Sequence, residues 1–371
     1  MQAPATPPPS SNHVWYNMIV VIFTVVRAQH QGAMALMGDT DQPAIPAPTP
    51  PPPPPHAIYA SMRRQSRIAA DLSIYGVPRP LGGGEILFGN VYSTLRARGE
   101  REWWRCTRVT HRHFIRLLSA IQPHCPDAAG HHRRCNPSNQ LLLVIMWLAG
   151  YPTLQHLAML FGVSESAVWR TVHYVLPALV VVVRSSACDL SNPALRASLP
   201  RTPEFPQAIG IIDCTHHDIE TPQSRLHEPL YYRRDQAFHT VTTQVIVDLR
   251  GKPIHVSTGY PGSCHDLRVF RDSGAGALLQ AGEVLLGDQG YLRGPFISPF
   301  SISDPDPTHR YFNGRLSHWR IRVEQCNRYL KRWRALATRW RGGLPLLSAA
   351  VVAVAGICAQ QLEVEPLYTD V

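Results

Sequence analysis

Lysine is nearly absent from this sequence of 371 residues. Only Lys252 and Lys331 are lysines, so arginine supplies almost all of the 36 basic residues, which exceed the 26 acidic residues and give a net charge of +10. Arginine forms bidentate contacts with phosphate, and an excess of it favours a polyanionic partner such as nucleic acid. A coding bias towards arginine explains the ratio of arginine to lysine equally well.

Paired cysteines and long hydrophobic runs are also missing. The eight cysteines are scattered without a Cys-x-x-Cys pair, which is typical of reduced thiols in a large intracellular protein. The apolar runs Val14–Val26 and Leu344–Cys358 are shorter than the roughly 20 residues that span a bilayer. The first run lacks the basic start of a secretory signal. We therefore expect neither a membrane segment nor secretion.

The composition divides the chain into three parts. Residues 1–100 contain the unbroken run Pro50–Pro55 and the glycines Gly82–Gly84. Consecutive prolines favour extended polyproline II and exclude a helix, so this part is expected to be mostly disordered, as a linker rather than a proline-recognition site. Residues 101–190 show helical periodicity, and residues 205–362 alternate between strand and helix patterns.

The segment 153–173 resembles a helix-turn-helix. Thr153 and Ser164 are typical helix-capping residues, and Gly162 between them permits a left-handed turn. A DNA-reading form would direct the polar start of the second helix into a major groove, whereas a plain helical hairpin would not. The groove-facing residues would be Glu165, Ser166, Trp169 and Arg170.

The C-terminal part predicts a mixed α/β sheet whose first three strands are antiparallel. The predicted elements are strand 208–213, strand 240–248, strand 252–259, helix 265–272, strand 283–287 and helix 315–340. Two strands end in acids, Asp213 and Asp288, and Glu324 lies beside the apolar stripe of the last helix. Acids at strand ends of one sheet edge can converge, and we expect these three to meet in an open cleft.

Three converging carboxylates raise one another's pKa unless a cation relieves the repulsion. Oxygen ligands at an open site suit Mg²⁺ or Mn²⁺, with substrate phosphate completing the coordination shell. Two such metals would activate water and stabilise the leaving 3′ oxygen of a phosphodiester. Asp213, Asp288 and Glu324 are therefore the candidate metal-binding and catalytic residues.

Several motifs in this order resemble the PIF/Harbinger group of aspartate-aspartate-glutamate transposases and the nucleases derived from them. The matching pieces are Ile212-Asp213-Cys214-Thr215-His216, Gln244-x-x-x-Asp248-x-x-Gly251, Pro261-Gly262-Ser263-x-His265-Asp266, Leu286-Gly287-Asp288-x-Gly290-Tyr291 and Arg320-x-x-x-Glu324. The resemblance covers roughly residues 100–360 and implies a ribonuclease H-like fold with metal-dependent cutting of DNA. It also implies Asp213, Asp288 and Glu324 as the catalytic acids. A separate DNA-binding partner protein is a further expectation.

Other residues near these acids can each have either a functional or a structural role. Asp266 competes with Asp288 for the second place in the triad, and its position at a helix start favours a supporting or structural role. His216 either orients Asp213 or contacts phosphate, or is an ordinary structural histidine. The basic residues of the last helix are natural phosphate contacts or a merely solvated face. They are Arg320, Arg328, Lys331 and Arg332.

The chain departs from the family pattern at three places. It has Arg233–Gln236 where relatives carry Asn-Arg-Lys-Gly, Asn327-Arg328 where they carry Phe-Gly, and no Leu-His-Asn signature around Gly356–Gln361. A domesticated or decayed DNA-binding protein without cleavage is therefore the alternative to a nuclease. A phosphohydrolase of small substrates is disfavoured by the basic charge. We expect the nucleus in a eukaryote and the cytoplasm otherwise.

Overall fold

The computed structural model describes residues 90–124, 136–223, 228–234, 237–292 and 294–368. The predicted disordered region, including the proline run, lies outside the described residues except for its last stretch. The first described helix, α3, begins at Val91, within the part of the chain that the composition assigned to this region.

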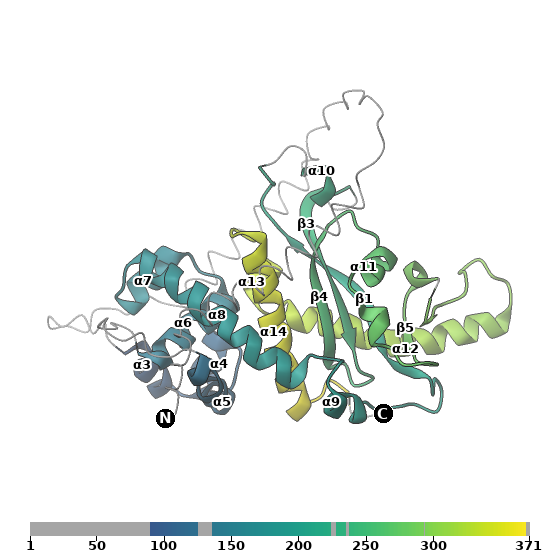
Figure 1. Ribbon diagram of the computed structural model, residues 1–371, viewed down its shortest axis with the longest axis horizontal. Coiled ribbons are helices and arrows are strands. Elements are labelled where there is room, and N and C mark those ends of the chain that lie inside the picture. Colours follow the sequence, from purple (N-terminus) through teal and green to yellow (C-terminus); the bar gives the residue numbers. More distant parts are fainter. Residues whose placement is uncertain (1–89, 125–135, 224–227, 235–236, 293, 369–371) are drawn as a thin grey trace, which may run out of the picture.

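Seven helices form the described helical region that precedes the sheet (Figure 1). Asn136, Thr153 and Ser164 each cap a helix by accepting a hydrogen bond from a backbone N–H in its first turn. Gly162 adopts the predicted left-handed conformation, with φ of 63°. The helices are α3 (Val91–Ala97), α4 (Glu100–Thr107), α5 (His111–Ile121), α6 (Pro137–Gly150), α7 (Leu154–Phe161), α8 (Glu165–Ala187) and α9 (Pro193–Ala197).

The sheet combines three antiparallel strands with two parallel ones. Strand β3 lies between β1 and β4 and is antiparallel to both, whereas β5 is parallel to β1 and β6 is parallel to β5. The short β2 pairs with the start of β3. This arrangement is that of a ribonuclease H-like fold, as predicted. The strands are β1 (Ala208–Asp218), β2 (Tyr232–Arg233), β3 (Phe238–Val247), β4 (Pro253–Pro261), β5 (Val284–Leu286) and β6 (Phe296–Ile297).

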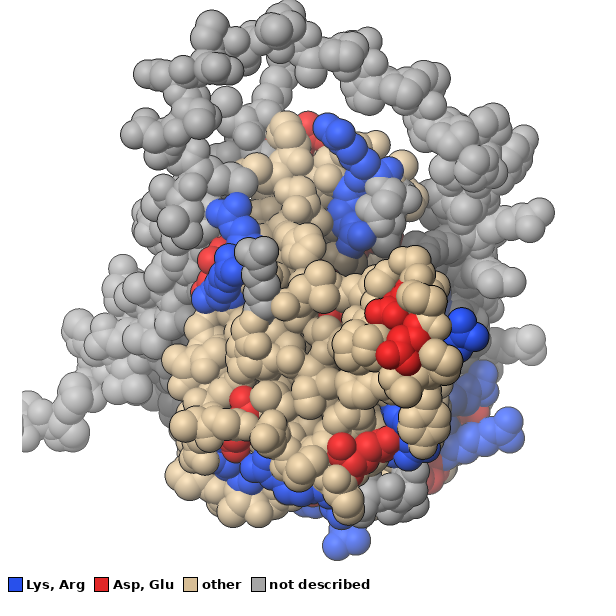
Figure 2. All heavy atoms as spheres, turned by 90° about the vertical axis from the view of Figure 1, so that its right-hand side faces the viewer, with Lys and Arg blue, Asp and Glu red and all other residues tan. Residues whose placement is uncertain are grey.

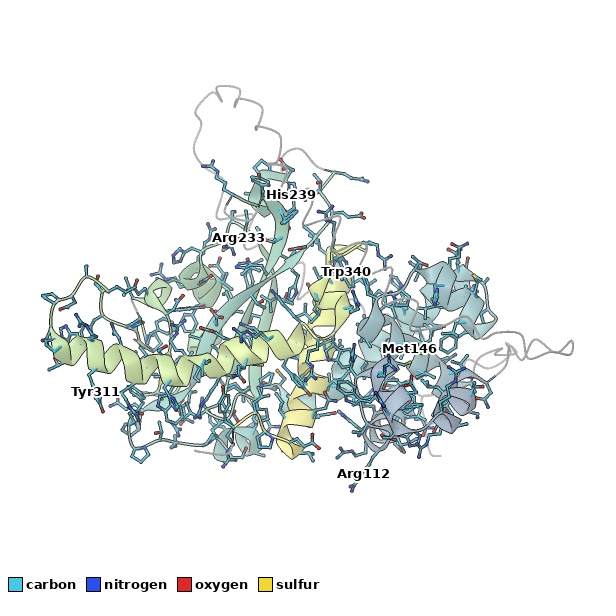
Figure 3. The ribbon with its side chains drawn as sticks, turned by 180° about the vertical axis from the view of Figure 1, so that it is seen from behind. Arg112, Met146, Arg233, His239, Tyr311 and Trp340 are labelled. Carbon is cyan, nitrogen blue, oxygen red and sulfur yellow. The ribbon has the colours of Figure 1, made fainter. Side chains whose placement is uncertain are left out.

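Helix α12 (Pro307–Leu330) runs across the sheet and contacts β1, β3 and β5 (Figure 3). The predicted continuous helix over 315–340 is wrong at both ends: α12 begins earlier, and the chain turns after Leu330 before the short α13 (Arg334–Ala337). The turn allows Trp333 and Trp340, each 1% exposed, to enter the core. Other elements here are α10 (Glu228–Tyr231), α11 (Asp266–Asp272), η3 (Ala275–Leu278) and η4 (Gln289–Tyr291).

Helices α8 and α14 (Leu344–Val364) are long and apolar enough to cross a membrane by length and composition alone. Both pack inside the protein instead: α14 lies against α8 on one side and β4 on another (Figure 1). Their apolar surface is the core that joins the helical region to the sheet, with Val183, Val354 and Ile357 fully buried.

Candidate active site

The register of the parallel strands brings Asp213, in the middle of β1, next to Asp288, which lies just beyond the end of β5. The predicted strand 208–213 is therefore too short, because β1 continues to Asp218. Ile211 on β1 pairs with Leu286 on β5, and each acid follows two residues later in its chain. Asp288 then caps the next turn, η4, where its Oδ1 accepts a hydrogen bond from the Gly290 N–H at 2.8 Å. The two acids that strand patterns identified are therefore neighbours.

Asp213 is held from the side of α12. Asn327, which is 8% exposed, donates a hydrogen bond from Nδ2 to Asp213 Oδ2 at 2.9 Å. The pKa of Asp213 is raised from 3.8 to about 7. Burial is the largest cause of this rise, and the negative charges of Asp288 and Asp266 contribute to it. A backbone N–H at Cys214 and the guanidinium of Arg320 act in the opposite direction without cancelling the rise.

Asp266 approaches Asp288 from the side of α11. A Cβ added to Gly290 would lie 2.9 Å from Asp288 Oδ1 and 3.6 Å from Asp266 Oδ2, so both carboxylates crowd one glycine. Burial raises the pKa of Asp266, and the charge of Asp288 adds to that rise, while a hydrogen bond with Cys214 lowers it. The structure thus places Asp266 next to Asp288, and the charges of both act on Asp213.

Glu324 lies on an exposed position of α12, less than one turn before Asn327 and about one turn after Arg320. Helical spacing directs these three side chains to similar sides of α12. No interaction between Glu324 and either aspartate is recorded in the described part of the chain. The structure therefore places Glu324 on the helix that covers the site without bringing it to the two aspartates.

Asp213 and Asp288 are the side chains of the site that could bind a divalent metal ion. Within the described ranges, no three His, Cys, Asp or Glu side chains lie close enough together to hold an ion. Asp213 and Asp288 nevertheless supply two carboxylates, and the pKa of Asp213 is raised mainly by burial and in smaller part by the charge of Asp288. Mg²⁺ is commonly bound by one or two carboxylates together with water and substrate phosphate. The pair fits such an ion.

His216 does not face Asp213. Strand side chains alternate, and Asp213 points towards α12 whereas Cys214 and His216 point to the opposite face of β1. His216 Nδ1 lies 3.1 Å from Thr242 Oγ1, and its Nε2 contacts Arg233. The predicted orienting contact with Asp213 is therefore not made in this structure.

The four basic candidates, on α12 and just after it, lie in different surroundings, and the Arg332 guanidinium lies over the Trp104 and Tyr329 rings. Arg320 is half-buried, its charge acts on Asp213, and its Nε is a buried donor without a partner among the described residues. Arg328 and Lys331 are exposed at the end of the helix. Asn327 was not predicted as a site residue; its only signal in the sequence was that it stands where relatives carry an apolar residue.

The predicted DNA-reading face is exposed at the start of α8. Ser166, Trp169 and Arg170 all lie on the surface, and the Trp169 side chain is 51% exposed. The Trp169 ring stacks on His173, with centroids 3.9 Å apart. His173, one turn further along the same face, is a candidate that the sequence reasoning missed, although its i, i+4 spacing from Trp169 could have identified it.

Comparison with protein families assigns both parts of the chain. Residues 212–359 match the family described as DDE superfamily endonuclease, and residues 134–185 match the helix-turn-helix of DDE superfamily endonuclease. The two matches fall on the sheet domain with its acids and on helices α6 to α8. These two parts of the chain are therefore similar to DDE superfamily endonucleases.

Individual relatives are more distant. The human protein named "Putative nuclease HARBI1" is 27% identical over 188 residues, which are 48% of this chain and 53% of that protein. The "Probable transposase for insertion sequence element IS702" of Microchaete diplosiphon is 27% identical over 257 residues, covering 67% of this chain and 88% of that protein. The chain thus spans about half the length of the HARBI1 relatives it matches. No solved structure matches it.

Proposed function

We propose that this chain is a divalent-metal-dependent DNA endonuclease of the Harbinger type, with Asp213, Asp288 and Glu324 as its metal-binding and catalytic residues. The observation that carries the proposal is the parallel register of β1 and β5, which sets Asp213 on β1 beside Asp288 just after β5. DDE superfamily endonucleases generally use divalent metals, and Mg²⁺ or Mn²⁺ suits these oxygen ligands.

When bound, the metal would supply an activated water and charge stabilisation for the leaving oxygen. The residues of the chain prepare the site for it. Asn327 holds one oxygen of Asp213, while Gly290 lets Asp266 and Asp288 approach each other. Arg320 supplies a positive charge beside Asp213, where a scissile phosphate would need neutralisation.

DNA would be bound by the helix-turn-helix and by α12. Ser166, Trp169 and Arg170 form the base-reading face, and Arg328 and Lys331 extend the contacts along the phosphate backbone. The far end of the sheet domain is a poor DNA surface: Figure 2 shows mostly uncharged side chains there, with separate acidic and basic groups. We propose a nuclear location in a eukaryote, and a separate DNA-binding protein as a further partner.

The second candidate function is DNA binding without cleavage. It is favoured by one observation: Glu324 is exposed and is not brought to the two aspartates. A decayed catalytic site would show this arrangement, but so would a site whose third acid closes on the metal only when metal and DNA are present.

A plasmid-nicking assay separates the two candidates. The intact chain is incubated with supercoiled plasmid in Mg²⁺, in Mn²⁺ and in EDTA, beside the variants Asp288→Ala and Asp304→Ala. Asp304 is a half-buried acid paired with His309 outside the site and serves as the matched control. Metal-dependent nicking by wild type and Asp304→Ala, lost in Asp288→Ala, supports the nuclease. Equal nicking by wild type and Asp288→Ala refutes it and leaves the DNA-binding function.

A further inference from the structure

We propose that α8 and a joint formed by Tyr151, Trp340 and Arg341 make the helix-turn-helix and the catalytic domain one rigid body. This body would fix the distance along DNA between the sequence that is recognised and the bond that is cut. The inference rests on the proposed function and adds to it the residues that determine where cleavage falls.

The first connection is α8 itself. Its N-terminal turns carry Trp169 and Arg170, and its C-terminal turns pack on α14. Gly356 of α14 faces Val183 of α8 so closely that an added Cβ would lie 2.4 Å from Val183 Cγ2. Trp169 and Val183 are separated by about 21 Å along one continuous helix, at 1.5 Å per residue. A shift where α8 meets α14 therefore moves the recognition residues with it.

The second connection lies at the other end of the helix-turn-helix. Tyr151, 7% exposed, ends α6 immediately before α7, and its ring stacks on Trp340 with centroids 5.1 Å apart and planes 15° apart. Arg341 makes two hydrogen bonds to the same residue. Its backbone N–H donates to Tyr151 Oη at 2.9 Å, and its Nη2 donates to the Tyr151 carbonyl at 2.7 Å. The guanidinium also lies over the Tyr151 ring, 4.4 Å from its centroid.

The joint continues into the strand that carries the first catalytic acid. The Trp340 N–H donates to the Asp218 carbonyl at 2.7 Å, and the Glu220 N–H donates to the Trp340 carbonyl at 3.3 Å, at the end of β1. Asp213 lies five residues earlier, about 17 Å along the same strand. Figure 3 shows Trp340 between the sheet and the helical region.

Two separated connections resist both bending and rotation, whereas either alone would leave a hinge. The linkage passes through backbone hydrogen bonds, a stacked aromatic pair and a close helix contact, with Trp340 only 1% exposed. Interfaces between domains that move are typically smaller and more polar. The helix-turn-helix thus has a fixed position on the catalytic domain rather than a flexible attachment to it.

The test measures the distance between the two parts directly in the full chain. Nitroxide labels are attached through unnatural amino acids at Met159 on α7, 60% exposed, and at Ser317 on α12, also exposed. This route avoids the native cysteines. The labelled variants are Arg341→Ala, which removes the guanidinium contacts with Tyr151 but keeps the backbone hydrogen bond, Gly356→Ala, which pushes α8 from α14, and the control Arg339→Ala. Arg339 is exposed next to the joint and lies over Phe238 instead.

We expect one narrow distance in wild type and in Arg339→Ala, loss of the narrow distance in Arg341→Ala, and a shifted distance in Gly356→Ala. If Gly356→Ala does not fold, Arg341→Ala decides alone, because that side chain is on the surface. A broad distribution in wild type overturns the rigid connection. An Arg341→Ala distribution equal to that of wild type overturns the role of the Arg341 side chain in it.

The consequence for cleavage is measured on a duplex selected from a randomised library by the intact chain. Wild type should cut at one offset from the selected sequence, and Arg341→Ala should bind equally well but cut at scattered positions. One offset for both proteins overturns the role in positioning. If wild type cuts no DNA with Mg²⁺ or Mn²⁺, the proposed nuclease function is wrong, while the distance measurement still decides the rigid connection.

Discussion

Replacing Asp213 by asparagine should stabilise the metal-free protein at neutral and alkaline pH. Burial and two neighbouring carboxylates raise the pKa of Asp213 to about 7 in the folded protein, against 3.8 ordinarily. Because the folded state has the higher pKa, it binds more protons than the unfolded state between these values. The free energy of unfolding therefore falls as pH rises from about 4 to about 7 and stays low above that.

The magnitude follows from this difference of about three pKa units, which corresponds to about 4 kcal/mol at pH 8 and to about 2 kcal/mol at pH 5. Asparagine remains neutral throughout, and its carbonyl can still accept the hydrogen bond from Asn327. The variant should therefore gain stability that grows with pH. At pH 8 we expect a rise in Tm of at least about 5 °C, from the usual 2–4 °C per kcal/mol in domains of this size.

Scanning calorimetry at pH 5 and pH 8, first in EDTA and then with Mn²⁺, measures this effect. Mn²⁺ should raise the Tm of wild type more than that of Asp213→Asn, because the cation removes the repulsion that the variant lacks. Asp304→Asn is the control: the backbone N–H of Asp306 and the His309 side chain lower the pKa of Asp304, so its neutralisation should not stabilise.

An Asp213→Asn variant that melts at or below the wild-type temperature in EDTA at pH 8 would contradict this reasoning. It would mean that the Asp213 carboxylate is adequately solvated or paired in the absence of metal. A gain in Tm of the same size at pH 5 and pH 8 would also contradict it, because the effect would then not come from ionisation.

Three further outcomes are expected. Asp288→Asn and Glu324→Gln should each nearly abolish cleavage, while DNA affinity in gel-shift assays stays intact or rises. Asp266→Asn should lower cleavage much less. Wild-type cleavage by Glu324→Gln would exclude Glu324 from the catalytic residues. Arg170→Ala should weaken DNA binding in EDTA and reduce the slope of log K against log salt by about one if it meets a phosphate; unchanged affinity would exclude Arg170 from the interface. Asn327→Leu should weaken Mn²⁺ binding, measured by calorimetric titration, and wild-type affinity would show that its amide does not position the site.

The sequence was sufficient for most of the fold because its signals are local. Capping residues at Thr153 and Ser164 with Gly162 between them specify a helix-turn-helix, and the structure has each of them in that role. Apolar strands followed by Asp213 and Asp288 likewise indicate that these two acids are neighbours, although β1 continues beyond Asp213 to Asp218. Helical periodicity alone did not locate the ends of α12, because the apolar spacing continues into the separate helix α13.

The contacts within the site required the tertiary structure. Asp266 follows β4 and Asp288 follows β5, and no sequence spacing shows that Gly290 lets their carboxylates meet. The opposite orientation of His216 follows from strand alternation, which was available from the sequence once β1 was known to continue to Asp218. A predicted strand ending at Asp213 removed that argument.

Asn327 shows how a departure from a family pattern can be part of the site. The sequence marks it as a polar residue where relatives carry an apolar one, which by itself suggests decay. In the structure its amide donates to Asp213, and its own Oδ1 is a buried acceptor with no partner among the described residues. Burying an amide oxygen without a hydrogen bond costs free energy, and an apolar residue would fill the same space without that cost. The polar amide therefore indicates a role beyond packing. The change at Asn327 is therefore a change in how Asp213, the first acid of the proposed site, is held, and the contact joins β1 to α12, which also carries Glu324.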